Sequence, residues 1–194
     1  MSERLLFLPC IAILLALGLS ACGGGSDETG KVEGVIETSA TTTDPADCKK
    51  LETQRFMEQV SQESGNAAVE ECEEEAKKDE GSESVTISEV KVDGSSATAE
   101  AALKGGGFDG QTVEVALVKD GDQWKMDEVV KFTKLDQARL VEFFKEELSK
   151  PSSELSPKLA GCFVEAFEGG SQAEIEELLL SRSSKALEEV AEAC

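Results

Sequence analysis

The chain contains no histidine and no tyrosine, and its single tryptophan is Trp124. Histidine is the most frequent general base and nitrogen ligand for metals, and tyrosine is a common phenolic acid in active sites. A Ser-His-Asp or Cys-His nucleophilic site therefore cannot be built from these residues. The composition predicts a protein that is not an enzyme, with no cofactor and no metal.

Basic residues are also scarce, because 19 Lys and Arg face 40 Asp and Glu, for a net charge of −21. Binding to nucleic acid depends on basic stripes that neutralise phosphates, so nucleic acid is disfavoured as a partner. The same charge would keep a folded domain soluble and away from anionic lipid headgroups.

No apolar run reaches the roughly 20 residues that a membrane-spanning helix needs. The longest run, Leu5–Leu19, contains Pro9 and Gly18 and follows a start whose only basic side chain is Arg4. It ends in Leu19-Ser20-Ala21-Cys22, with small residues where an exported chain is cleaved. These features predict an export signal rather than a membrane span.

All four positions from Leu19 to Cys22 resemble the signal motif of bacterial lipoproteins. The resemblance implies a signal peptide over 1–21 and a diacylglycerol on the thiol of Cys22. It implies a protein anchored on the extracytoplasmic face of the cell membrane, since two acyl chains anchor a protein stably. Gly23-Gly24-Gly25-Ser26 is typical of a flexible tether, so residues 22–30 are predicted to be a linker.

An even number of cysteines remains once Cys10 leaves with the signal and Cys22 carries lipid. They are Cys48, Cys72, Cys162 and Cys194. Cysteines of exported proteins usually form disulfides, and three pairings are open here. Pairing Cys48 with Cys72 and Cys162 with Cys194 is favoured, because each pair falls within one helical segment. Each bond would stabilise the fold by roughly 3–4 kcal/mol. The alternative of a four-thiolate zinc site lacks the required Cys-x-x-Cys spacings.

The segment up to residue 78 has helical signals. Lys31–Ser39 is compatible with a short helix or with irregular structure, and Asp44-Pro45 marks a helix start. Thr53 is a cap that would divide the next stretch, and a further helix is predicted over 67–78. This last helix carries five glutamates, which indicate either a cation site or, as we favour, a solvated acidic face. They are Glu70, Glu71, Glu73, Glu74 and Glu75.

Between residues 85 and 132 apolar residues alternate with polar ones, which predicts a four-stranded antiparallel meander. Asp93-Gly94 and Asp120-Gly121 are hairpin turns, and a glycine-rich stretch over 105–110 forms a longer connection. A shift of parity between Ile87 and Val90 predicts a β-bulge. One strand carries small alanines where its neighbours carry large residues, which is typical of a sheet curved around helices.

Residues 135–194 have the 3-4 apolar spacing of helices. Pro151 ends one helix, Ser156-Pro157 begins the next, and Ser171 with Glu174 forms a capping box. The predicted fold class is α+β, with N-terminal helices packed on a curved four-stranded antiparallel sheet, followed by a C-terminal helical unit. The predicted domains are 31–134 and 135–194, the second closed by the Cys162–Cys194 disulfide.

The order of helices followed by a meander resembles the cone-shaped α+β roll of the nuclear transport factor 2-like (cystatin-like) superfamily, which includes ketosteroid isomerases and polyketide cyclases. Four stretches are similar to exported actinobacterial members: 48–56, 68–72, 90–99 and 120–126. The resemblance covers residues 31–134 and implies a pocket inside the cone. The early hairpin of fuller members is missing, which predicts a reduced cavity.

The predicted function is that of a non-catalytic binding or interaction module, with an envelope protein or a small apolar ligand as partner. The pocket is predicted to be lined by Val115, Leu117, Trp124 and Met126, although Trp124 is more typical of a core residue. The alternatives are an accessory envelope lipoprotein with a filled core, or an enzyme of the ketosteroid isomerase type. An apolar cavity would favour ligand binding, and an inward carboxylate with a raised pKa would favour the enzyme.

Two further carboxylate patterns are weaker. Glu114 would serve as a buried base only if it pointed inward, and the opposite parity of Val113 and Val115 argues against that. Asp120-x-Asp122 begins like a calcium loop, but later positions lack the Gly and Glu that such a loop requires. We interpret it as a hairpin turn.

Overall fold

The computed structural model describes residues 25–78, 81–150, 156–181 and 185–194. The predicted signal peptide and the lipidation site Cys22 lie outside the described residues. Within the described ranges, no helix combines the length and the apolar character needed to cross a membrane.

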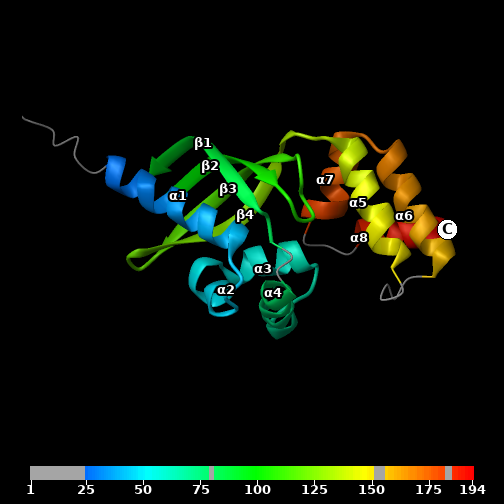
Figure 1. The fold of residues 1–194 in the computed structure, drawn as a ribbon, viewed down its shortest axis with the longest axis horizontal. Helices are drawn as coiled ribbons and strands as arrows, with labels where there is room; N and C mark the ends of the chain where they lie inside the picture. Colours follow the sequence, from blue (N-terminus) through cyan, green and yellow to red (C-terminus); the bar gives the residue numbers. More distant parts are fainter. Residues whose placement is uncertain (1–24, 79–80, 151–155, 182–184) are drawn as a thin grey trace, which may run out of the picture.

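The chain folds as α+β, with helices before and after one antiparallel sheet, as predicted (Figure 1). The N-terminal helices are α1 (Gly25–Thr41), α2 (Ala46–Leu51), α3 (Gln54–Ser61) and α4 (Asn66–Lys78). The strands are β1 (Ser84–Asp93), β2 (Ser96–Lys104), β3 (Thr112–Asp120) and β4 (Gln123–Lys134). The C-terminal helices are α5 (Gln137–Ser149), α6 (Pro157–Gly169), α7 (Gln172–Leu180) and α8 (Lys185–Ala193).

Helix α1 is longer than predicted, because it begins at Gly25. The prediction of a flexible linker over 22–30 is therefore wrong for residues 25–30, while 22–24 lie outside the described residues. Glu28 explains the difference: its carboxylate accepts hydrogen bonds from Lys119 Nζ at 2.9 Å and Trp124 Nε1 at 2.8 Å. An acidic residue in the first turn also complements the helix dipole. These contacts hold the start of α1 against the β3–β4 hairpin.

The sheet is a meander in the order β1-β2-β3-β4. Its predicted bulge lies between Ser88 and Lys91, where Glu89 has a left-handed φ of 52°. The alanines on the inward face of β2 are buried together with Val32 and Ile36 of α1. Figure 1 shows α1 lying across this face of the sheet, so the sheet and α1 form two layers with the core between them.

Helices α2, α3 and α4 form a compact group beside the sheet (Figure 1). Thr53 caps α3, since its side chain accepts a hydrogen bond from the Phe56 amide, and it divides α2 from α3 as predicted. The Cys48–Cys72 disulfide joins α2 to α4 with a Cα–Cα distance of 6.2 Å. Cys48 is buried with Met57 in a small core of its own.

The C-terminal helices form a second body at the end of the molecule opposite the start of α1 (Figure 1). Helices α5 and α6 pack through the stacked rings of Phe144 and Phe167, whose centroids are 4.3 Å apart. The Cys162–Cys194 disulfide links α6 to the end of the chain, with a Cα–Cα distance of 6.2 Å. Both favoured cysteine pairings are therefore confirmed. The predicted capping box of Ser171 and Glu174 is present at the start of α7.

Two buried glutamines attach the C-terminal helices to the rest of the fold. Gln59 on α3 donates through Nε2 to the carbonyls of Val129 at 2.8 Å and Leu180 at 2.6 Å, and it accepts from the Val129 amide at 2.7 Å. Gln111 donates to the Asp136 carbonyl at 3.0 Å and accepts from its amide at 2.7 Å. Buried polar groups need such partners, so these bonds fix where the helical body sits.

Candidate ligand-binding cavity

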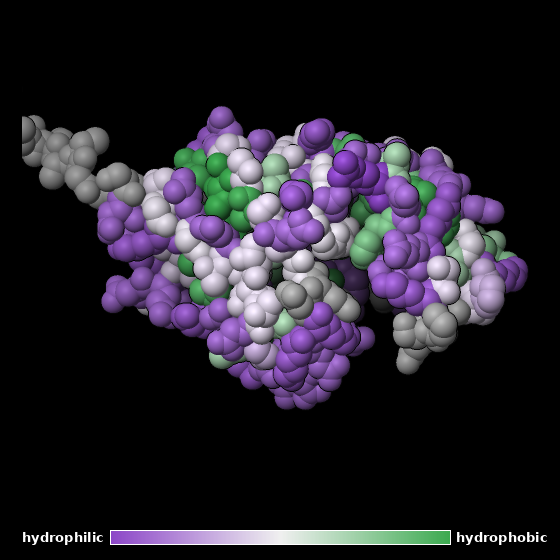
Figure 2. All heavy atoms as spheres, viewed as in Figure 1, coloured by the Kyte–Doolittle hydropathy of each residue, from purple (hydrophilic) through white to green (hydrophobic). Residues whose placement is uncertain are grey.

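A connected cavity of about 960 Å³ lies between the sheet, the N-terminal helices and the C-terminal helices. Figure 2 shows the surface hollowed between the sheet-bearing body and the C-terminal helices, with apolar atoms visible around and inside the hollow. Small-molecule sites in proteins typically have volumes of about 300–1,000 Å³. The cavity is thus large enough for a small organic ligand.

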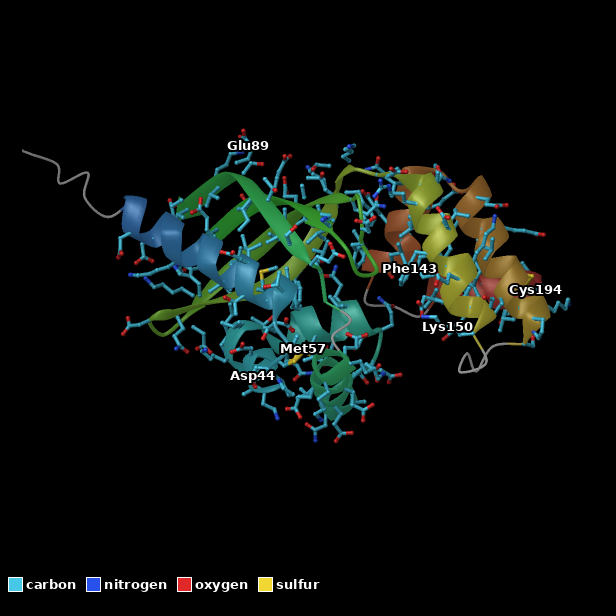
Figure 3. The ribbon with its side chains drawn as sticks, in the orientation of Figure 1. Asp44, Met57, Glu89, Phe143, Lys150 and Cys194 are labelled. Atoms are coloured by element: carbon cyan, nitrogen blue, oxygen red, sulfur yellow. A yellow bond between two sulfur atoms is a disulfide. The ribbon has the colours of Figure 1, made fainter. Side chains whose placement is uncertain are left out.

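Three parts of the chain form its walls. Ala101, Val115 and Met126 contribute from the sheet. Met57 on α3 and Phe143 on α5 lie on opposite sides of it (Figure 3). The loop between β2 and β3 closes against α5, where a Cβ at Gly107 would lie 3.3 Å from the Phe143 ring. The walls are largely apolar, as expected of a site that holds an apolar molecule.

The structure separates the four predicted pocket residues into two pairs. Val115 and Met126 line the cavity, whereas Leu117 and Trp124 do not. All four side chains are buried. Leu117 pairs directly with Met126 across β3 and β4, yet it is not part of the cavity wall, and Trp124 lies nearer the β3–β4 turn. The alternation of residues identified the inward face of the sheet, but it carried no information on which residues of that face border the cavity.

Trp124 is a core residue, the interpretation that the sequence favoured. Its indole N–H donates to Glu28, and Lys119 Nζ lies 5.6 Å from its ring centroid. Hydrogen bonds from Lys119, Lys31 and Trp124 lower the pKa of Glu28 to about 2. The group formed by Glu28 and these three residues therefore secures α1 to the sheet rather than presenting a surface to a ligand.

The volume does not match the reduced cavity expected from the missing hairpin. The C-terminal helices account for the difference, because Leu140, Phe163 and Leu178 supply a wall that lies outside the predicted α+β roll. The cavity consequently depends on both parts of the chain. A cone formed by residues 31–134 alone would lack this side.

Glu52 is the notable polar residue of the cavity wall. It occupies the junction between α2 and α3, where its backbone pairs with Met126 of β4. The adjacent Thr53 amide donates to the Met126 carbonyl at 2.9 Å. The side chain is only 8 % exposed. Both backbone attachments fix this carboxyl group against the apolar interior.

The environment of Glu52 disfavours its charged form. Burial raises its pKa to about 7, with a smaller contribution from the like charge of Glu75 on α4. The hydroxyl of Ser39 donates to Oε1 at 2.7 Å and opposes the shift. A carboxyl group with a pKa near neutrality can gain or lose a proton during ligand binding or catalysis.

The Cys48–Cys72 disulfide lies beside this carboxyl group, with Cys72 Sγ 3.4 Å from Glu52 Oε2. Oxygen and sulfur atoms of Glu52 and the two cysteines all lie within 4.8 Å of one another, a spacing that would suit a metal ion. Thiolate, however, is the form of cysteine that binds metals, and both sulfurs are bonded to each other. We therefore assign this group to the disulfide and not to a metal centre.

The other carboxylate candidates have structural partners. Glu114 forms an ion pair with Lys131 at 3.5 Å on the outward side of the sheet. Asp120 pairs with Lys125 at 3.2 Å across the β3–β4 turn. In the acidic helix α4, Glu73 pairs with Lys49 at 2.6 Å.

Glu52 was missed at the sequence level, although the chain holds a signal for it. It follows Cys48 by four residues, a spacing that from the sequence alone suggests one helix face, although in the structure α2 ends at Leu51 and Glu52 has an extended backbone. Once Cys48 is predicted to be buried in a disulfide, a carboxylate on the same face becomes a candidate buried acid. No family model matches this chain, and the comparisons with curated proteins and with solved structures found no match.

Proposed function

We propose that this protein is a lipid-anchored protein of the cell envelope whose folded part binds a small apolar molecule. The observation that carries the proposal is the connected cavity of about 960 Å³ with largely apolar walls. A filled core would have favoured an accessory role without a ligand. The order of helices and strands also supports membership of the nuclear transport factor 2-like superfamily, with a C-terminal helical addition.

The position of the anchor fits this proposal. A lipid on Cys22 would precede α1, whose first turn lies at the end of the molecule opposite the C-terminal helices (Figure 1). The 17 residues of α1 span about 25 Å, at 1.5 Å per residue. The cavity would then stand away from the bilayer on the extracytoplasmic face, open to ligands of the envelope.

The test is saturable binding of 1-octanol to the full chain in lipid nanodiscs, measured by calorimetry above the partition into empty nanodiscs. Leu103→Trp would occupy the cavity that Leu103 lines. Ala102→Trp is the matched control, because neighbouring residues of a strand point to opposite faces. We expect L103W to weaken binding at least tenfold and A102W to leave it unchanged. Absence of saturable binding to the unmodified chain would refute the proposal.

A second candidate function is proton transfer within a bound ligand, and Glu52 is the observation that favours it. A buried carboxyl group with a pKa of about 7 would exchange a proton with a carbon acid near neutral pH. Isomerisation of a β,γ-unsaturated ketone, followed by absorbance of the conjugated product, would test this. A rate that Glu52→Gln leaves unchanged would exclude Glu52 as the base.

A further inference from the structure

The Glu52 carboxyl group in the cavity wall has fewer hydrogen-bond donors around it than its two oxygens can accept. Oε1 accepts one hydrogen bond from Ser39. The atom facing Oε2 is Cys72 Sγ, which is bonded to Cys48 and has no proton to donate. An ionised carboxylate can accept about four hydrogen bonds, so Glu52 retains capacity for a donor supplied from the cavity.

No cation balances Glu52 within the described part of the chain. Glu52 forms no ion pair with any of the described residues, and the charged group that acts on it is Glu75, which has the same sign. The nearby lysines of α2 are engaged elsewhere, Lys49 with Glu73 and Lys50 with Asp47. A buried carboxylate without a cation is costly, because burial removes its hydration without replacing it.

The remaining wall near Glu52 suits the body of an amphiphile. Ile36, Phe56, Met57 and Ala76 line the same cavity and present carbon atoms. A carboxylate within an apolar wall is best suited to bind a molecule that has a cationic head and a hydrocarbon body. Beside Glu52, a ligand with an anionic head is disfavoured by Glu52, by Glu75 and by the net charge of −21, and the cation of the cavity wall, Lys150, pairs with Glu147.

We propose that the cavity selects an apolar amine, whose ammonium group pairs with the Glu52 carboxylate while its hydrocarbon part occupies the apolar walls. This inference rests on the proposed ligand-binding function and adds the chemical class of the ligand. The amine would supply both the missing charge and the missing hydrogen-bond donors. Charge-assisted hydrogen bonds of this kind are roughly twice as strong as neutral ones.

The proposal also predicts how affinity changes with pH. An alkyl ammonium keeps its proton up to about pH 10, as a lysine does. Glu52, with a pKa of about 7, must lose its proton to pair with it. Affinity for the amine should therefore be highest above pH 8 and should fall as the pH drops below 7. Affinity for an alcohol of equal length should change much less.

The experiment compares octylamine, 1-octanol and octanoate with the full chain in lipid nanodiscs, by calorimetry at pH 6 and pH 8.5 with empty nanodiscs as blank. At pH 8.5 we expect octylamine to bind at least tenfold more tightly than either of the others. Glu52→Gln should remove this preference and leave octanol affinity within twofold. Glu74→Gln, which changes a carboxylate of α4 that does not line the cavity, is the control and should keep the preference.

The outcomes separate the two proposals. Equal binding of octylamine and octanol, with L103W weakening both, would overturn the amine selectivity and leave the ligand-binding function standing. Saturable binding of none of the three compounds would overturn both. A preference for octylamine that persists in E52Q, or that does not fall between pH 8.5 and pH 6, would show that Glu52 does not bind the ammonium group.

Discussion

The two disulfides join helix pairs in contrasting surroundings. They bridge similar sequence separations, 24 residues for Cys48–Cys72 and 32 for Cys162–Cys194. Cys48 is 1 % exposed, belongs to a core cluster and lies beside the buried Glu52. By contrast, α8, which Cys194 follows, contains no buried residue. Similar loop lengths therefore do not imply similar effects on the folded structure. The Cys48–Cys72 bond supports a cavity wall, whereas the Cys162–Cys194 bond fastens the last residue to α6.

Removal of the first disulfide should have the largest effect. Cys48→Ala with Cys72→Ala loses roughly 3–4 kcal/mol of loop-closure stabilisation and, in addition, packing around a buried side chain. We expect the free energy of unfolding to fall by about 4–5 kcal/mol in urea titrations, together with loss of octanol binding. Retained stability and binding would mean that the bond is not part of the cavity wall.

Removal of the hydrogen bonds that attach the C-terminal helices to α3 and β4 should have the next largest effect on stability. Gln59→Leu removes three hydrogen bonds and leaves the Val129 amide and the Leu180 carbonyl without partners. Unsatisfied buried groups of this kind should lower the free energy of unfolding by about 3 kcal/mol. Gln54→Leu on the same helix is the control, because its hydrogen bonds are exposed to water and should matter by less than about 0.5 kcal/mol.

Glu52 should make the stability of the protein depend on pH. Its pKa rises from 4.5 to about 7 on folding, so the folded state binds the proton more tightly. The stability contributed by the protonated group is complete below pH 4.5 and is lost as the pH rises through 7, a loss of roughly 3 kcal/mol. Glu52→Gln should remove this dependence. The variant should therefore be more stable than the native protein at pH 8.5 and equally stable at pH 5.

Denaturation at several pH values between 5 and 8.5 would measure this effect. That range also avoids Glu28, whose lowered pKa acts in the opposite direction, with stability lost as the pH falls from 4.5 towards 2. A native protein whose stability is constant from pH 5 to 8.5 would contradict the buried state of Glu52.

Removal of the second disulfide should have the smallest effect. Cys162→Ala with Cys194→Ala allows α8 to detach while the other helices stay folded. The loss of global stability is then limited to the free energy with which α8 docks, about 1–2 kcal/mol for a few partly buried side chains. Hydrogen exchange should show lost protection confined to α8. A loss of stability as large as that caused by removing Cys48–Cys72 would contradict the contrast drawn between the two disulfides.

Much of the fold could be predicted because its signals are local. The alternation of apolar residues gave the four strands, Asp93-Gly94 and Asp120-Gly121 their turns, and the residues around Thr53 and Ser171 their helix caps. Each depends on neighbours within a few residues. The linker prediction is wrong because the signal of Gly23-Gly24-Gly25-Ser26 is local, whereas the partners of Glu28, Lys119 and Trp124, lie more than 90 residues away along the chain.

The candidate site could be predicted only in part. Val115 and Met126 were correctly placed at a cavity, since strand parity turned them inward. Leu117 and Trp124 share that parity but are buried in the core without lining the cavity, and Trp124 is held there by Glu28 of α1. Nothing within either strand distinguishes the inward residues that line the cavity from those that do not; the difference arises from how the helices pack over the sheet.

The sequence by itself determined the strands, their turns and most of the helices, and it favoured the cysteine pairing that the structure has, because periodicity, caps and turns act over short distances along the chain. Only the tertiary structure decided where the cavity lies and that Glu52 lines it. The carboxyl group is buried because α1, α4 and β4 meet around it, and its pKa depends on the exclusion of water by all three. Such exclusion is a property of the assembled helices and strands, and no single segment contains it.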